Sequence, residues 1–116
     1  MSSIFGSLFG GGNSVVNLNS DSFEQQLNED KDAVLIDTRT KAEYNDGHLR
    51  DAKLIDIYSS SFQSEIDKLD RSKSYYVYCR SGNRSYHAAL AMKKMGFEKV
   101  YNLESGIIGW YGEVVQ

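Results

Sequence analysis

The residues best suited to chemistry lie in one stretch, residues 75–85, which contains the only cysteine of the chain. A β-branched and aromatic run ends at Cys79, and a polar loop with Arg80, Gly82 and Arg84 leads into a helix-forming segment. If the helix begins near Asn83 or Arg84, the loop amides and the helix N-terminus point at the sulfur and favour negative charge there. Two guanidinium groups act in the same direction, so we expect the pKa of the Cys79 thiol to lie below its free value of about 8.5. Cys79 is therefore a candidate nucleophile at neutral pH.

A simpler interpretation is that this cysteine is a small buried apolar residue at the end of a strand. The arginines, the glycine and the helix start favour the nucleophile, because a structural cysteine gains nothing from them. We assign Arg80 and Arg84 to anion binding, with pairing of one of them to a surface carboxylate as the alternative. Ser81 and Asn83 can donate side-chain hydrogen bonds to the anion, although Asn83 fits turn or helix-cap chemistry equally well. Gly82 is expected to serve the backbone shape.

Size and charge limit the kinds of partner. The 116 residues fit one domain, and the net charge of -3 argues against a nucleic-acid or membrane-surface role, since both need a cationic excess. Small anions or proteins are the expected partners. One cysteine excludes an internal disulfide framework, and with His48 and His87 it cannot supply a usual structural zinc site. We expect no metal and no cofactor, and a reducing, cytoplasmic location.

The first 14 residues differ from the rest in composition. They lack a basic start, and glycine and serine interrupt their apolar residues, so a signal peptide fits poorly. No stretch of the chain is long and apolar enough to span a bilayer. We expect residues 1–14 to be a flexible segment and residues 15–116 to form the folded domain. A short docking segment with Ile4, Phe5, Leu8 and Phe9 on one helical face is the alternative.

Strand and helix signals alternate along the domain. Strands are expected at residues 15–18, 33–36, 53–57, 74–78 and 99–103. Capping boxes at Asp21-x-x-Glu24 and Thr40-x-x-Glu43 predict two helix starts; other helices are expected from about residue 61, after the cysteine loop, and as a last turn over 105–110. Apolar rather than alternating strands between helices indicate an α/β fold with a parallel sheet covered on both faces.

In such a sheet the ligand site lies beyond the carboxyl ends of the strands, where both Asp37 and Cys79 are expected. Asp37 and Arg39 are interpreted as an ion pair near this edge that supports the structure, with a part in shaping the site as the alternative. His48 and His87 are expected to be hydrogen-bonded or surface residues, because a thiolate held by dipoles and arginines needs no general base.

Four separated patterns together resemble the single-domain form of the rhodanese (thiosulfate sulfurtransferase) family. They are Leu35-Ile36-Asp37-Thr38-Arg39, Glu43-Tyr44-x-x-Gly47-His48-Leu49, Tyr78-Cys79-Arg80-Ser81-Gly82-Asn83-Arg84-Ser85 and Gly106-Ile107-Ile108-Gly109-Trp110. The resemblance covers the chain from about Val15 to its end and implies a rhodanese-like fold, a five-stranded mostly parallel sheet with helices on both faces. Two departures are Gly47-His48-Leu49-Arg50-Asp51-Ala52, where many relatives have Gly-His-Ile-Pro-Gly-Ala, and Ser105, where glycine is common.

The resemblance also implies the chemistry. Cys79 would take sulfane sulfur from thiosulfate or a persulfide donor and pass it from its own persulfide to a thiol, cyanide or a protein acceptor. The loop from Cys79 to Arg84 matches the family's six-residue active-site loop, whereas phosphatases and arsenate reductases of this fold carry a loop one residue longer. With no second cysteine to act as a resolving thiol, the acceptor must come from outside. A phosphatase or arsenate reductase, and a non-enzymatic partner-binding module, are the alternatives.

Overall fold

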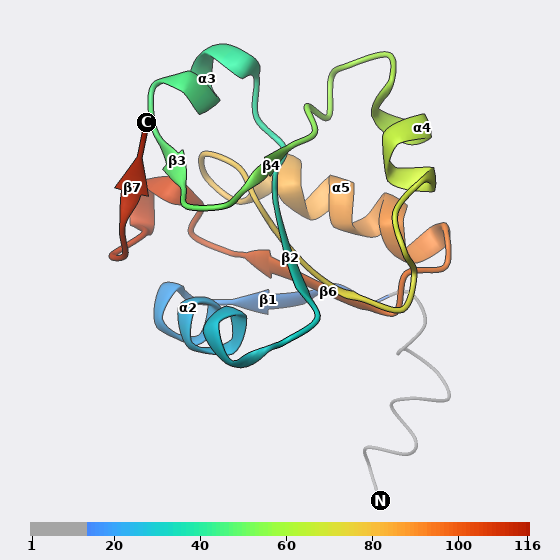
Figure 1. The fold of residues 1–116 in the computed structure, drawn as a ribbon, viewed down its shortest axis with the longest axis horizontal. Coiled ribbons are helices and arrows are strands. Elements are labelled where there is room, and N and C mark those ends of the chain that lie inside the picture. Colours follow the sequence, from blue (N-terminus) through green and yellow to red (C-terminus); the bar gives the residue numbers. More distant parts are fainter. Residues whose placement is uncertain (1–13) are drawn as a thin grey trace, which may run out of the picture.

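The structure, a computed structural model, describes residues 14–116, and the expectations for residues 1–13 lie outside this part. Five parallel strands form one sheet in the order β1-β6-β5-β2-β4 (Figure 1). The strands are β1 (Val16–Leu18), β2 (Ala33–Asp37), β4 (Lys53–Leu54), β5 (Ser74–Tyr78) and β6 (Lys99–Leu103). The sheet confirms the expected fold class. Its central strand, β5, is buried along its whole length, as its unbroken apolar and aromatic sequence predicts.

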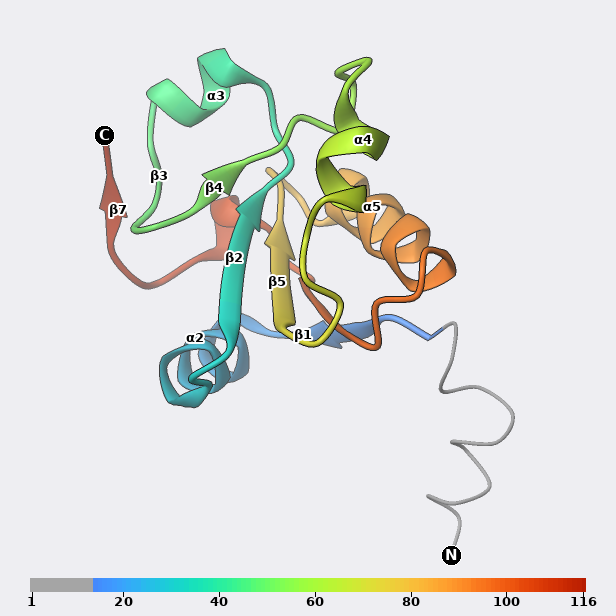
Figure 2. The ribbon, with the colours of Figure 1, turned by 45° about the vertical axis from the view of Figure 1, so that its right-hand side comes forward.

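Helices lie on both faces of the sheet. They are α2 (Ser20–Glu29), α3 (Lys41–Asn45), α4 (Phe62–Asp67), α5 (Asn83–Lys94) and the 3-10 turn η1 (Ile107–Gly109). Figures 1 and 2 show α2 on one side of the strands and α4 with α5 on the other. The longest of these helices has 12 residues, and none within the described part of the chain is long and apolar enough to cross a membrane.

The two faces of the sheet have separate apolar cores. Ile36 on β2 packs with Ala89 and Met92 of α5, whereas Leu35, its neighbour in the sequence, packs with Phe23 of α2 on the opposite face. This is the alternation that a strand imposes on successive side chains. Full burial of a side chain of this size stabilises the fold by about 1.5–3 kcal/mol. The two cores therefore fix the sheet from both sides and hold the strand ends in register.

Two local expectations need correction. The first helix is not capped by a box at Asp21; its N-cap is Asn19, whose side chain accepts a hydrogen bond from the Ser22 amide at 2.8 Å. The strand expected at residues 53–57 is only two residues long. After it, the amides of Ile55 and Ile57 still donate to carbonyl groups at the end of β2, so the chain follows that strand without a regular ladder.

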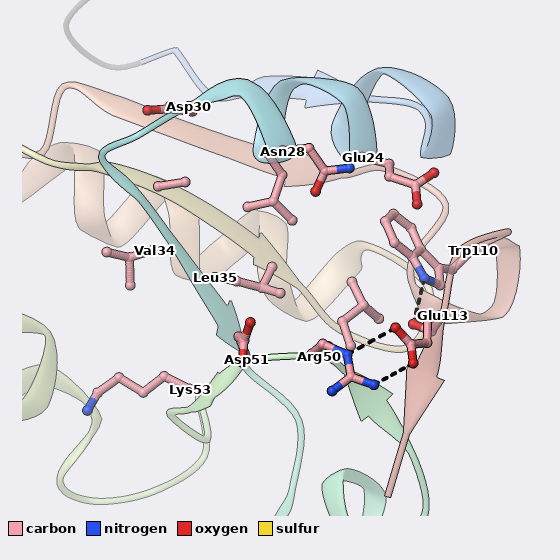
Figure 3. Close-up of a pocket in the computed structure, with 13 residues that line it drawn as sticks. Glu24, Asn28, Asp30, Val34, Leu35, Arg50, Asp51, Lys53, Trp110 and Glu113 are labelled. Carbon is pink, nitrogen blue, oxygen red and sulfur yellow. Dashed lines mark hydrogen bonds and ion pairs between the residues drawn. The ribbon is translucent and has the colours of Figure 1, made fainter.

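A second, two-stranded sheet was not expected from the sequence. β3 (His48–Leu49) pairs antiparallel with β7 (Val114–Val115), which brings the end of the chain beside the turn that follows α3 (Figure 1). Between this two-stranded sheet and α2 lies a cavity of about 640 Å³ over Leu35 and Trp110, with the Arg50–Glu113 ion pair at its edge (Figure 3). None of its lining residues belongs to the cysteine loop, so it is separate from the site described next.

Candidate active site

Cys79 lies at the carboxyl end of the central strand, directly after β5. The chain then turns sharply, and α5 begins at Asn83, as the sequence predicts. The Gly82 amide donates a hydrogen bond to Cys79 Sγ at 3.2 Å, and the Ser85 hydroxyl lies 3.4 Å from the same atom. The sulfur therefore sits inside the turn, at the start of the helix, where amide dipoles favour negative charge.

The surroundings of the sulfur favour its ionised form. Burial alone would raise the pKa of the Cys79 thiol, but hydrogen bonds from the Ser85 hydroxyl and from the amides of Ser85, Ser81 and Gly82 outweigh it and lower the pKa. The cysteine is only 1% exposed. Such low exposure favours a reacting group with a single protruding atom over a bulky one.

Two carbonyl groups of the loop are held from outside it. The Ile107 amide donates to Cys79 O at 2.9 Å, and the Ile108 amide donates to Arg80 O at 3.2 Å. A planar peptide whose carbonyl is turned outward directs its N–H the opposite way. The peptide of Arg80 O carries the Ser81 amide, which is one of the amides that lower the pKa of Cys79. The first residues of η1 thus orient two peptide groups of the loop.

Two glycines allow this close backbone contact. Gly82 has φ 96°, and a Cβ on it would lie 2.1 Å from Glu104 O. Gly106 has φ 70°, and a Cβ on it would lie 2.1 Å from Arg80 O. A side chain at either position would force the loop and the segment after β6 apart. Gly82 therefore has the backbone role expected of it, and it, rather than Asn83, is the N-cap of α5.

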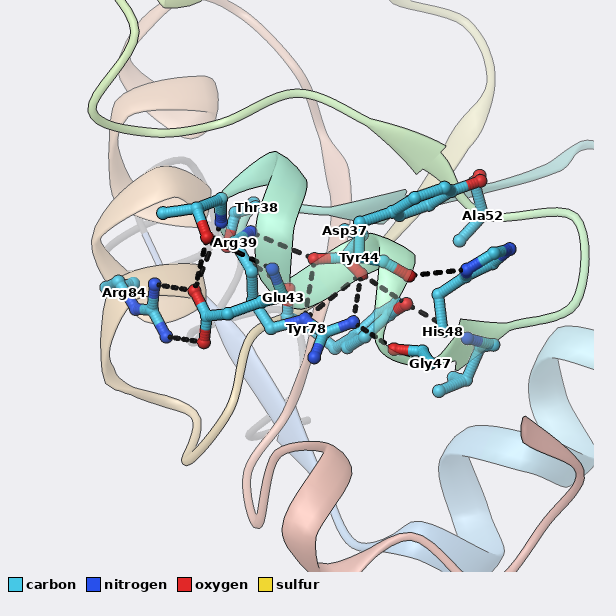
Figure 4. Close-up of polar contacts among 12 residues, drawn as sticks. Asp37, Thr38, Arg39, Glu43, Tyr44, Gly47, His48, Ala52, Tyr78 and Arg84 are labelled. Atoms are coloured by element: carbon cyan, nitrogen blue, oxygen red, sulfur yellow. Dashed lines mark hydrogen bonds and ion pairs between the residues drawn. The ribbon is translucent and has the colours of Figure 1, made fainter. Parts of the chain in front are cut away.

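The two arginines of the loop differ in their surroundings. Arg84 donates to both carboxylate oxygens of Glu43, at 2.8 and 2.9 Å (Figure 4), and this pairing lowers the pKa of Glu43 to about 2. Glu43 is held in place by the capping box with Thr40, which confirms that predicted helix start. Arg80 is exposed, with no side-chain hydrogen bond to another residue within 14–116, and Ser81 and Asn83 are also exposed. Arg84 thus presents a partly neutralised charge near the sulfur.

The ion pair expected between Asp37 and Arg39 is present and buried. Arg39 Nη2 lies 2.7 Å from Asp37 Oδ2 and also donates to Gly47 O at 2.6 Å (Figure 4). The Tyr78 hydroxyl donates to Asp37 Oδ2 at 2.6 Å and accepts from the Leu49 amide at 3.0 Å. Burial and the Asp37 charge raise the pKa of Tyr78. This network connects the ends of β2 and β5 to β3, and Tyr78, its member on β5, directly precedes Cys79.

The histidines lie away from the sulfur contacts. His48 Nδ1 is 2.9 Å from Tyr44 O, and its ring stacks on the Tyr44 ring at 3.7 Å between centroids. His87 is exposed on α5. The sequence interpretation named neither Ser85 as a ligand of the sulfur nor Asn102 on β6, which is 2.6 Å from the Ser85 hydroxyl. Ser85 is the last residue of the stretch 75–85 that the sequence singled out, but no residue near Asn102 in the sequence indicated a contact between Asn102 and Ser85.

Comparison with known proteins agrees with this geometry. Residues 19–113 match the family described as Rhodanese-like domain. The chain belongs to this family. It is 33% identical over 93 residues to a protein of Allochromatium vinosum named Sulfurtransferase, covering 80% of this chain and 85% of that protein. It is 30% identical to the putative sulfur carrier protein YrkF of Bacillus subtilis over 86% of this chain, but spans only 53% of that protein.

The fold is similar to solved rhodanese structures. A rhodanese-related protein of Thermoplasma volcanium superimposes with a TM-score of 0.74 at 27% sequence identity, covering 86% of this chain and 97% of that one. The five-stranded sheet and its flanking helices are thus those of a single rhodanese domain.

Proposed function

We propose that this rhodanese-family protein is a sulfurtransferase that carries sulfane sulfur as a persulfide on Cys79. The observation that carries the proposal is the position of Cys79 Sγ, which accepts the Gly82 amide hydrogen bond inside the loop at the end of β5. The family match and the relative named Sulfurtransferase support sulfur transfer in general. Thiosulfate or a persulfide as donor, and a thiol, cyanide or a protein as acceptor, are the finer parts of the proposal.

The reaction takes two displacement steps. The Cys79 thiolate attacks the outer sulfur of thiosulfate, the S–S bond of the donor breaks, and sulfite leaves with its electron pair. The loop amides stabilise the negative charge that stays within the loop. An external thiolate, its proton already lost to solvent, or cyanide then attacks the outer sulfur of the persulfide and returns Cys79 to the thiolate. Because only one atom of the donor must enter the loop, the 1% exposure of Cys79 is compatible with the chemistry.

The other predicted site residues take supporting roles in this proposal. Arg80 is assigned to anion binding, and its exposed side chain supports this role. Arg84, although paired with Glu43, adds positive potential near the sulfur; its hydrogen bond to Glu43 and, to a lesser degree, the Cys79 charge raise the pKa of Arg84. Ser81 and Gly82 supply amides that act on the sulfur, and Asn83 opens the helix. We also propose a cytoplasmic location, because a reactive free thiol persists best in a reducing compartment.

Mass spectrometry of the intact protein after thiosulfate treatment tests the proposal. We expect a gain of one sulfur atom that cyanide or a reductant reverses and that the Cys79→Ser variant lacks. Hydrolysis of an aryl phosphate without any sulfur gain would instead support the phosphatase alternative. A Cys79→Ser variant that keeps the full biological effect would support a partner-binding module.

Replacing Arg80 or Arg84 with alanine tests the electrostatic part separately. We expect either change to raise the pKa of Cys79 and to weaken thiosulfate binding, because each removes a positive charge beside the anion site. The rate of thiol alkylation against pH measures the first effect, and the thiosulfate dependence of persulfide formation measures the second. Unchanged curves in both variants would contradict the anion-binding roles.

A further inference from the structure

Ser85 and Asn102 form a buried polar pair behind the sulfur. Ser85 is 0% exposed and Asn102 is 2% exposed. Ser85 Oγ lies 2.6 Å from Asn102 Oδ1 and 3.4 Å from Cys79 Sγ. The hydroxyl is therefore within hydrogen-bond distance of two acceptors, although it carries only one hydrogen.

The orientation of the Asn102 amide follows from its other contacts. Asn102 Nδ2 lies 3.1 Å from Gly82 O and 3.0 Å from Asn17 Oδ1. Gly82 O can only accept, so the atom that faces it must be the amide nitrogen. The Oδ1 atom then faces Ser85 and can only accept. In this arrangement the Ser85 hydroxyl donates its hydrogen to Asn102 and turns a lone pair toward the sulfur.

A lone pair suits one protonation state of the cysteine and opposes the other. The neutral thiol can donate its S–H to Ser85 Oγ, whereas the thiolate can only accept and needs the hydroxyl hydrogen itself. We infer that Asn102 and the Cys79 thiolate compete for the single hydroxyl hydrogen of Ser85, which makes Ser85 a two-position donor and Asn102 a positioning residue for the sulfur. This inference rests on the proposed role of Cys79 as the nucleophile.

The competition gives each state of the reaction its own hydrogen-bond arrangement. In the thiolate the Ser85 hydroxyl turns to the charged sulfur, since hydrogen bonds to charged groups are the stronger ones. In the persulfide the charge moves to the outer sulfur, and the hydroxyl returns to Asn102. Asn102 also holds Gly82 through its carbonyl, and the Gly82 amide donates to the same sulfur.

A substitution cycle read out as the pKa of Cys79, from alkylation rate against pH, tests the competition. In the wild type we expect Ser85→Ala to raise the pKa by about half a unit, because the lost bond to sulfur is offset by the bond to Asn102. In an Asn102→Ala background nothing competes for the hydroxyl, and the rise should be about one unit or more. In an Asn102→Leu background, which removes the acceptor but keeps the side-chain size, the rise should match that with Asn102→Ala.

The relative size of the Ser85→Ala pKa shift in the three backgrounds decides whether the hydroxyl hydrogen is shared in this way. A Ser85→Ala shift that is equal in all backgrounds, or larger in the wild type than with Asn102→Ala, would overturn the inference, because a purely structural network predicts one of those results. Should Asn102→Ala fail to fold, Asn102→Leu, which keeps the side-chain size, decides by comparison with the wild type. Ser85→Thr keeps the hydroxyl and should restore the pKa. Asn17→Ala, at the exposed end of the network, is the matched control and should leave the Ser85→Ala shift unchanged.

Other charges near the loop do not alter this comparison. They are Arg84 with its partner Glu43, the exposed Arg80, and the buried pair of Asp37 and Arg39. All five residues are the same in every variant, so their effects cancel within each background. The alkylation readout does not depend on sulfur transfer. A missing thiosulfate mass shift in the wild type would therefore count against the proposed function alone, and a missing coupling would count against this inference alone.

Discussion

The sharpest perturbation of the loop is Gly106→Ala, a change outside the loop itself. The new Cβ would lie 2.1 Å from Arg80 O and 2.5 Å from the Ser81 amide nitrogen, whereas real Cβ contacts essentially never fall below 3.0 Å. The nearer contact alone requires a retreat of about 0.9 Å, the difference between 3.0 and 2.1 Å. A misplacement of about 1 Å lowers catalytic rates by roughly 100-fold. We therefore expect persulfide formation from thiosulfate to slow by about that factor.

Gly96→Ala is the matched control. Gly96 also has positive φ, at 100°, but a Cβ there meets nothing within 4 Å. Backbone strain at either glycine is expected to lower the free energy of unfolding by about 1–3 kcal/mol, somewhat more at Gly106, whose ψ of -176° is nearly exclusive to glycine. Chemical denaturation measures that loss, and stopped-flow persulfide formation on folded protein measures the rate. A Gly106→Ala variant that is folded and reacts as fast as Gly96→Ala would refute the view that this contact positions the loop.

Three further outcomes follow from the charges at the site. Folding lowers the pKa of Cys79, so ionisation of the thiol stabilises the fold. The free energy of unfolding of the wild type relative to Cys79→Ser should be greatest above the unfolded pKa of about 8.5 and should fall as the pH drops through the lowered pKa of the folded state; a difference that does not change with pH would contradict this. Glu43→Gln should lower the free energy of unfolding by about 1 kcal/mol at pH 7, and this difference should fade from pH 4.5 toward the Glu43 pKa of about 2. The same change releases Arg84 and should lower the pKa of Cys79 further; an alkylation curve moved to higher pH would contradict this. Asp37→Asn should lower the free energy of unfolding by about 3–5 kcal/mol, because it leaves the Arg39 guanidinium buried without its counter-charge. A loss below about 1 kcal/mol in urea denaturation would mean that Arg39 finds another partner.

Features encoded by neighbouring residues could be predicted from the sequence. The run that forms β5 and the helix start at Asn83 are local patterns, and so is the Thr40–Glu43 capping box. The predicted N-cap of α2 was wrong because Asn19 and Asp21, two positions apart, are both favourable N-cap residues, and only the folded geometry distinguishes them.

Contacts between distant residues could not be predicted in the same way. β3 and β7 have two residues each, too short for a periodic signal, and they meet only through the folded chain. The partner of Arg84 lies 41 positions away, and Asn102 is 17 positions from Ser85. A guanidinium in the loop indicates that an anion or a carboxylate will be near it, but the sequence alone does not say which one.

The loop sequence is therefore only part of what creates the reactive sulfur. Amide groups lower the pKa of Cys79, and one of them, the Ser81 amide, belongs to the peptide whose carbonyl the Ile108 amide holds from the opposite side. The contact is possible because Gly106 lets two backbones touch. Residues 79–84 placed between another strand and helix, without this support, would keep the arginines but lose the hold on the Ser81 amide. If the amides rather than the arginines carry the effect, the thiol of such a graft should have a pKa closer to its free value of about 8.5 than Cys79 has in this fold.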